Sequence, residues 1–258
     1  MSNLNPILNA IKPDFVSKNY QLINTSDLIS TIQAQGWHAT AARYAKVRNP
    51  AKDGFQKHEL IFRHDNFKGD ADSIPQLILR NSHDRTAALE FHLGFFRFAC
   101  SNGLIVGNGL ISSMKVYHVG NNLADKIGAM VTQALDNVPK VVEARNSMVE
   151  RVMSLDESAD FGYRAAAIIS NIRKIDSDVA RIIRPKRSAD YGNTLWQLFN
   201  VVQERSLSAL TGSRIEERAD GSIARKTVHG RKISSLDIDT KLNKQLFDLA
   251  LTYVGGAK

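Results

Sequence analysis

The chain has 258 residues, of which 43% are hydrophobic, and its 34 Lys and Arg against 26 Asp and Glu give a net charge of +8. This size allows one large domain, or a domain with a helical appendage. No apolar run approaches the roughly 18 residues of a membrane span, and the N-terminus lacks a secretory pattern. Cys100 is the only cysteine, which excludes an internal disulfide and a cysteine-rich zinc site. We expect a cytoplasmic protein without membrane contact or cofactor, and the charge favours nucleic acid as partner.

The first third of the chain predicts an arm followed by an antiparallel sheet. Residues 1–36 are expected to hold one short helix and a second helix over residues 28–35, capped by Ser26-Asp27 and closed by Gly36. Residues 37–121 alternate apolar and polar side chains between short turns, which is typical of a meandering sheet. The expected strands cover residues 37–48, 57–64, 74–80, 89–95 and 111–119.

The longest apolar stretch, residues 79–107, indicates where the core lies. Its alternation over residues 89–95 predicts a strand with one buried face. Asn102-Gly103 suits a tight turn, because both residues tolerate positive φ. A helix over residues 95–100 remains an open alternative, and we expect Cys100 to be a small buried side chain rather than a nucleophile.

From residue 122 the apolar period changes to three and four, which predicts long helices. Pro139 is expected to kink or break the first of them, and Ser154 with Glu157 fits a capping box that starts the next. Further helices are expected over residues 193–210 and 236–253. The predicted fold class is therefore α+β, with residues 122–258 packing on the sheet and a basic loop or hairpin at residues 211–235.

Two His-Asp pairs, His64-Asp65 and His83-Asp84, raise the alternative of a metal-dependent nuclease. Both pairs lie at expected strand ends, where aspartate commonly caps a turn, so we expect neither a metal site nor catalytic residues. The sequence contains no phosphate-binding loop and no nucleophile elbow. We therefore expect a binding protein rather than an enzyme.

Basic and aromatic residues cluster on the expected strands and in the basic segment. Such a surface can follow a phosphate backbone while bases stack on it. The alternative for each residue is a solvated strand edge. The expected DNA-binding residues are Arg43, Tyr44, Lys46, Arg48, Lys57, Arg63, Arg80, Arg85, Arg214, Arg218, Arg225, Lys226, Arg231 and Lys232.

The stretch NSHDRTAALEFHLGFFRFACSNGLIVG, residues 81–107, resembles the signature of an uncharacterised phage/plasmid-like protein family. Residues 194–196 and 199–204, with residues 233–251, are similar to later blocks of the same family. The resemblance implies an origin on a plasmid, prophage or conjugative element, near anti-restriction and DNA-repair genes, but no activity. The order of strands before helices also resembles single-strand annealing proteins, in architecture only.

Three functions follow as hypotheses. The first is a protein that binds single-stranded DNA in recombination or repair, with strand annealing left open. For its assembly we expect a homo-oligomeric ring or filament, with a monomer whose helices cover the sheet as the alternative. The second is an anti-restriction or counter-defence protein that binds a host protein. The third is the metal-dependent nuclease. The sequence does not decide between DNA and RNA.

Overall fold

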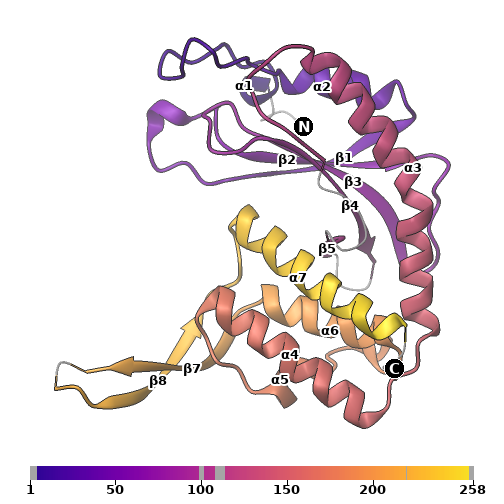
Figure 1. The fold of residues 1–258 in the computed structure, drawn as a ribbon, viewed down its shortest axis with the longest axis vertical. Helices are drawn as coiled ribbons and strands as arrows, with labels where there is room; N and C mark the ends of the chain where they lie inside the picture. Colours follow the sequence, from indigo (N-terminus) through magenta and orange to yellow (C-terminus); the bar gives the residue numbers. More distant parts are fainter. Residues whose placement is uncertain (1–4, 99–101, 108–113, 219, 256–258) are drawn as a thin grey trace. The chain divides into compact units, whose positions relative to one another are not determined.

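The computed structural model describes residues 5–98, 102–107, 114–218 and 220–255. The chain forms two compact units: Met1–Leu104 with Ile111–Val141, and Ile105–Leu110 with Val142–Lys258 (Figure 1). Strands dominate the first unit and helices the second, which confirms the α+β class. Among the described residues, no helix is long and apolar enough to cross a membrane.

An antiparallel sheet organises the first unit. Its strands are β1 (Trp37–Tyr44), β2 (His58–His64), β3 (Ser73–Asn81), β4 (Leu89–Arg97), β5 (Asn102–Ile105) and β6 (Met114–Val116). Strands β1 to β5 follow one another in the sheet in chain order, and β6 also pairs with β4. The meander predicted from the alternation is therefore present, with a short 3₁₀ turn, η1 (Pro50–Lys52), between β1 and β2.

One face of this sheet is apolar and forms the core of the unit. Leu60, Leu79 and Phe91 are at most 2% exposed, and each has a polar or charged neighbour in sequence that points to the opposite face. Helices α1 (Asn5–Leu8) and α2 (Thr25–Gln33) and the first turns of α3 (Leu123–Glu150) lie on one side of the sheet (Figure 1). The buried residues of α2 are Thr25, Leu28 and Ile32.

Helix α2 starts three residues earlier than expected. Asn24, in extended conformation, precedes its first turn, so Ser26 and Asp27 lie inside the helix rather than at its cap. The earlier start buries Thr25, whose hydroxyl lies 2.8 Å from Nε2 of His58. Gly36 follows the helix with a φ of +86°, as expected for a residue that ends it.

The tight turn expected at Asn102-Gly103 is wrong, because β5 already begins at Asn102. The extended backbone there continues into Leu104 and Ile105, which are 2% and 1% exposed. The helical alternative over residues 95–100 is also wrong where it can be checked, since β4 continues to Arg97. Cys100 lies outside the described residues.

A single helix, α3 (Leu123–Glu150), runs through Pro139 without a break. A proline inside a helix removes one backbone hydrogen bond and costs about 3 kcal/mol. Buried side chains on both sides of Pro139, Ala134, Val138 and Val141, are at most 1% exposed. We infer that their packing outweighs this cost, so the expected break does not occur.

Four helices form most of the second unit: α4 (Leu155–Arg173), α5 (Val179–Ile183), α6 (Leu195–Leu207) and α7 (Leu236–Val254). The predicted capping box of Ser154 and Glu157 starts α4, and a second box, Thr194 with Gln197, starts α6. Helix α7 packs against α4 and α6. Phe199 and Phe247 meet edge to face with ring centroids 5.9 Å apart, and a 3₁₀ turn, η2 (Ser188–Asp190), precedes α6.

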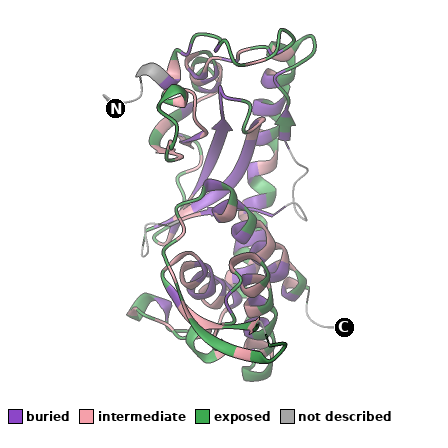
Figure 2. Cartoon of the chain, turned by 90° about the vertical axis from the view of Figure 1, so that its left-hand side faces the viewer, coloured by how far each residue is buried: buried purple, intermediate pink, exposed green. Residues whose placement is uncertain are grey.

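The basic segment forms an antiparallel hairpin of β7 (Leu210–Glu217) and β8 (Ile223–Gly230). The sequence left a loop or a hairpin open at this place. Figure 2 shows that most of the hairpin is exposed. Thus the longest basic stretch of the second unit lies on an exposed two-stranded ribbon.

Candidate nucleic-acid interface

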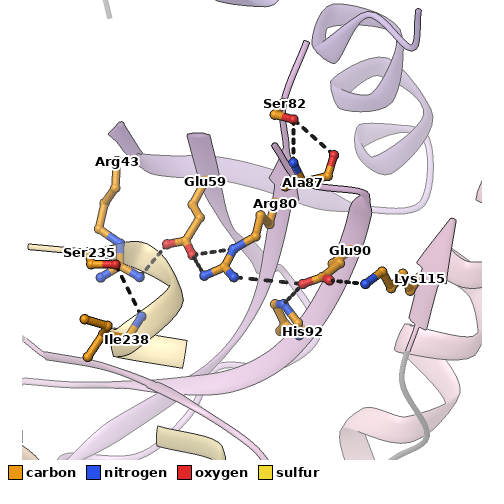
Figure 3. A network of polar contacts seen from close by, with 10 residues as sticks. All are labelled: Arg43, Glu59, Arg80, Ser82, Ala87, Glu90, His92, Lys115, Ser235 and Ile238. Carbon is orange, nitrogen blue, oxygen red and sulfur yellow. Dashed lines mark hydrogen bonds and ion pairs between the residues drawn. The ribbon is translucent and has the colours of Figure 1, made fainter. Parts of the chain in front are cut away.

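A row of alternating charges crosses the sheet (Figure 3). The register places Arg43 opposite Glu59, Glu59 opposite Arg80, Arg80 opposite Glu90, and Glu90 opposite Lys115. Consecutive charged groups lie 2.5, 2.5, 3.9 and 3.3 Å apart. Because facing residues in a sheet share a face, all five side chains lie on the face opposite the apolar core.

The centre of this row is buried and its charges compensate one another. The side chains of Glu59 and Arg80 are 0% and 5% exposed. Burial alone would raise the pKa of Glu90, but hydrogen bonds from His92 and Lys115 and the charges of His92 and Arg80 lower it to about 2. Arg80, expected at the nucleic-acid surface, is therefore an internal ion-pair partner instead.

The other cations expected on the sheet differ in exposure. Arg43 is 35% exposed and pairs with Glu59. Arg63 lies on the same face, with its guanidinium carbon 4.9 Å from the centroid of the Phe96 ring. Tyr44 and Lys57 are partly buried, and burial raises the pKa of Tyr44. Among the cations expected to bind DNA, those exposed in this unit are Lys46 and Arg48, which follow β1, and Arg85, which has a φ of +67°.

The two His-Asp pairs make structural contacts. His64 Nε2 lies 2.8 Å from the Gln35 carbonyl oxygen, while Asp65 pairs with His38. His83 Nε2 donates to the Ile7 carbonyl oxygen at 2.9 Å, and Asp84 accepts from the backbone and hydroxyl of Thr86. In the described part of the chain, no three His, Cys, Asp or Glu residues are grouped as metal ligands would be.

The root of the hairpin is fixed by close backbone contacts. Ser213 on β7 exchanges two backbone hydrogen bonds of 2.8 Å with Asp176, just beyond α4. A Cβ atom on Gly212 would lie 2.2 Å from the Asp176 carbonyl oxygen, and one on Gly230 would lie 2.4 Å from Ile175. Position 212 therefore requires glycine, because its neighbour is backbone, whereas a side chain at position 230 would only have to displace the end of the Ile175 side chain.

Arg173 holds the root of the hairpin through hydrogen bonds to backbone carbonyl groups. Its guanidinium donates to the carbonyl oxygens of Ser206, Ser208 and Arg231 at 2.7 to 2.8 Å. Partial burial lowers the pKa of Arg173. Because three carbonyl groups from both ends of the hairpin meet one side chain, the hairpin starts from a defined position on its unit.

The surface of the hairpin is basic on both faces. Arg214 and Lys226 face each other on one side, and Arg225 lies on the other side opposite Ile215. Lys226 pairs with Glu216 at 3.6 Å, and Arg214 donates to the Lys174 carbonyl oxygen. Within the described residues, no carboxylate forms an ion pair with Arg218 or Arg225.

The remaining expected cations, Arg231 and Lys232, are exposed and follow β8 directly. All six cations expected in the basic segment thus belong to the hairpin or its root. The sheet cations belong to the other unit, and sequence reasoning missed the pairing of Glu59 and Glu90 with Arg43 and Arg80. The signal for those carboxylates lies in strand register, which fixes cross-strand partners but which composition does not reveal.

The glycines that root the hairpin were also not recognised as structural. Gly212 and Gly230 both lie at the root end of the hairpin, where Gly230 pairs with Leu210 and Gly212 with Val228. Glycine at such positions often marks a close backbone approach, so this signal was present in the sequence. The partner of that approach, Asp176, lies more than thirty residues away and has no local signal.

A family model described as "Domain of unknown function (DUF932)" matches residues 13–228. Two curated proteins of Escherichia coli (strain K12) are similar: UPF0380 protein YafZ, 28% identical over 91% of this chain and 82% of its own, and UPF0380 protein YfjQ, 28% identical over 92% and 83%. No solved structure matches the chain. The expected membership of an uncharacterised family is confirmed.

Proposed function

We propose that this chain, which belongs to the DUF932 family, binds nucleic acid, with single-stranded DNA as the first substrate to test. The observation that carries the proposal is the exposed, rooted hairpin, on which Arg218 and Arg225 have no carboxylate partner among the described residues. Exposed cations without partners are available to phosphates, and phosphate contacts supply most of the affinity of such proteins.

The sheet unit offers a second set of contacts. Lys46, Arg48 and Arg85 are exposed, whereas Arg80 is excluded by its buried pair with Glu59. Arg63 stacked on Phe96 is a cation–aromatic pair of the kind that also packs against bases. We assign these residues an auxiliary role, within recombination or repair on a mobile element, where strand annealing would use both sets of contacts.

The experiment is fluorescence anisotropy with a labelled single-stranded oligonucleotide at low salt. The double variant R225A/K226A is expected to bind at least about tenfold more weakly, because two phosphate contacts are lost. A matched control, K126A/K140A, removes the same charge from exposed positions of α3 and should bind as the wild type does. No binding by the wild-type protein at low salt, either of this single strand or of a duplex, would refute the proposal.

One observation favours a second candidate, a counter-defence protein that binds a host protein. Ile215 and Ile223 on the hairpin are 60% and 76% exposed, and exposed apolar side chains are typical of protein contacts. Capture of one host protein from lysate, unaffected by nuclease and lost in an I215T/I223T variant, would support this candidate. If nuclease treatment removes the captured protein, the capture depends on nucleic acid, and the first proposal would be supported instead.

A further inference from the structure

One face of the hairpin combines exposed isoleucines with an arginine. Ile215 lies opposite Arg225, and Glu217 lies opposite Ile223. Because side chains alternate along each strand, Ile215, Ile223 and Arg225 share this face. All three are exposed, while the opposite face carries Arg214, Glu216 and Lys226. The two faces of the ribbon therefore differ in chemistry: this one exposes Ile215 and Ile223 beside Arg225 and Glu217, and the other carries the cations Arg214 and Lys226.

The net charge of the hairpin indicates which class of partner this face would bind. Residues 210–232 contain six Lys and Arg against three Asp and Glu. A polyanion is complementary to that balance, whereas an apolar protein surface alone would leave the arginine charges without partners. The partner should therefore present phosphates at its edges and apolar groups between them.

The hairpin can contact the phosphates of a single strand, but it has no aromatic residue on which the bases would stack. Single-stranded nucleic acid is typically held by aromatic side chains on which bases stack, and residues 210–232 contain no Phe, Tyr or Trp. Isoleucine has no flat surface for stacking. In a duplex, by contrast, the thymine methyl groups form apolar contacts on the floor of the major groove.

The shape of the hairpin fits that groove. Two paired strands lie about 4.8 Å apart, and a two-stranded ribbon enters the major groove of B-form DNA, which is about 12 Å wide. The tip is held by hydrogen bonds from Arg218 N to Ser222 O and from Gly221 N to Arg218 O, of 2.8 and 2.9 Å. With root and tip both fixed, the ribbon is pre-organised for insertion.

We propose that hairpin β7–β8 binds duplex DNA in the major groove, with Ile215 and Ile223 against thymine methyl groups and Arg225 beside them on base edges or phosphate. This inference rests on the proposed nucleic-acid function and adds a second substrate class to it. The A-form major groove of duplex RNA is too deep and narrow for side chains to read, so the arm selects DNA duplexes over RNA duplexes.

The test compares four ligands by anisotropy: an A·T-rich DNA duplex, the same duplex with deoxyuridine for thymine, an RNA duplex and a single strand. Wild-type protein is expected to lose about fourfold in affinity for each thymine methyl that it contacts, the ratio that burial of one methyl group gives. The variant I215T/I223T keeps β-branched side chains and the charge, and it should bind the thymine and deoxyuridine duplexes equally.

A control variant, I11T, removes an isoleucine that is 83% exposed in the other unit and should retain the thymine preference. Equal affinity of the wild type for the two DNA duplexes overturns the inference, as does equal binding of the RNA duplex. Binding of the single strand without the duplex overturns it while the proposed function stands, and no binding of any ligand refutes both. Loss of a nuclease-resistant host protein in I215T/I223T, with DNA binding unchanged, would assign the face to a protein.

Discussion

Glu59 and Arg80 face each other across β2 and β3, with Glu59 Oε1 3.0 Å from Arg80 Nε and 2.5 Å from Nη2. Their side chains are 0% and 5% exposed, so the pair is screened little by solvent. Arg43 and Glu90 extend it on either side. Arg80, the basic residue of β3, therefore stabilises the fold. The cations that could bind nucleic acid lie at other positions.

Removing one member of this pair should destabilise the first unit strongly. We expect Arg80→Met to lower the free energy of unfolding by about 3–5 kcal/mol, because the buried Glu59 carboxylate then lacks its main partner. The double variant E59Q/R80M should lose less than E59Q and R80M lose together. Urea unfolding measures all three values.

An exposed pair provides the comparison. Lys226 and Glu216 lie 3.6 Å apart with side chains 67% and 42% exposed. Lys226→Met should change the free energy of unfolding by less than about 1 kcal/mol. A cost for R80M no larger than that for K226M would contradict the structural role assigned to Arg80.

Buried histidines make stability depend on pH. Burial lowers the pKa of His58 and His83 to about 4, only partly offset by their hydrogen bonds to the Gln56 and Ile7 carbonyl oxygens and by the Asp84 charge. Below the unfolded value near 6.5, the unfolded chain gains protons that the folded one does not. Stability should thus fall as pH drops from 6.5 towards 4, by up to about 1.4 kcal/mol per pH unit for each histidine.

Urea unfolding at pH 7, 6 and 5 measures this dependence, and the range stays above the region where most carboxylates titrate. His118, whose pKa burial also lowers, adds to the same trend. An H229N variant changes an exposed histidine on the hairpin and should leave the slope unchanged. Equal stability at pH 7 and pH 5 would show that these imidazoles become protonated in the folded protein.

Much of the first unit is predictable from the alternation of apolar and polar side chains, although β2, β3 and β4 are buried on both faces rather than on one. The alternation that indicated residues 89–95 lies within β4, and the capping box at Ser154 is present. Pro139 was misjudged, since local propensity favours a break and the burial of Val138 and Val141 opposes it. Packing of this kind involves residues distant in sequence, so a local pattern does not report it.

The candidate site was predictable only in part, because composition shows where the cations are but not which of them have partners. The basic segment is visible in composition, and its six cations lie on or beside the hairpin. Whether a cation is free depends on its cross-strand partner, as Arg80 and Arg225 show in opposite ways. Register, and not composition, separates the two.

The hairpin root should not tolerate side chains. Gly212→Ala would place a Cβ 2.2 Å from the Asp176 carbonyl oxygen, so either the strand or the segment after α4 must move. We expect weaker protection of the hairpin amides in hydrogen exchange and a loss of unfolding free energy of at least about 1 kcal/mol. Gly128→Ala in α3 meets nothing within 4 Å and should stabilise by about 0.5–1 kcal/mol.

The salt dependence of binding should report how many phosphates the hairpin contacts. On single strands the logarithm of affinity falls with the logarithm of salt concentration by about 0.7 per phosphate contacted. R225A/K226A should therefore reduce the slope by about 1.4, while K126A/K140A leaves it unchanged. A slope equal to that of the wild type would place the phosphate contacts outside the hairpin.

The last prediction concerns assembly through the edge of the sheet. Within the described strands, β1 pairs with β2 on one side and with no strand on the other. An unpaired edge is a site for pairing with another chain, although the register shift between Ala39 and Ala41 partly blunts it. We expect a homo-oligomer, in which this edge meets a neighbouring copy and repeats as a ring or a filament.

Light scattering with and without single-stranded DNA measures the mass. Ala41→Lys adds a charge at an exposed position of the edge and should shift the protein to monomer, because charged edges oppose pairing. Ala129→Lys adds the same charge at an exposed position of α3 and should leave the mass unchanged. A monomeric wild-type mass in both conditions would exclude the ring and the filament, and the hairpin would then have to bind DNA without the added affinity of repeated sites.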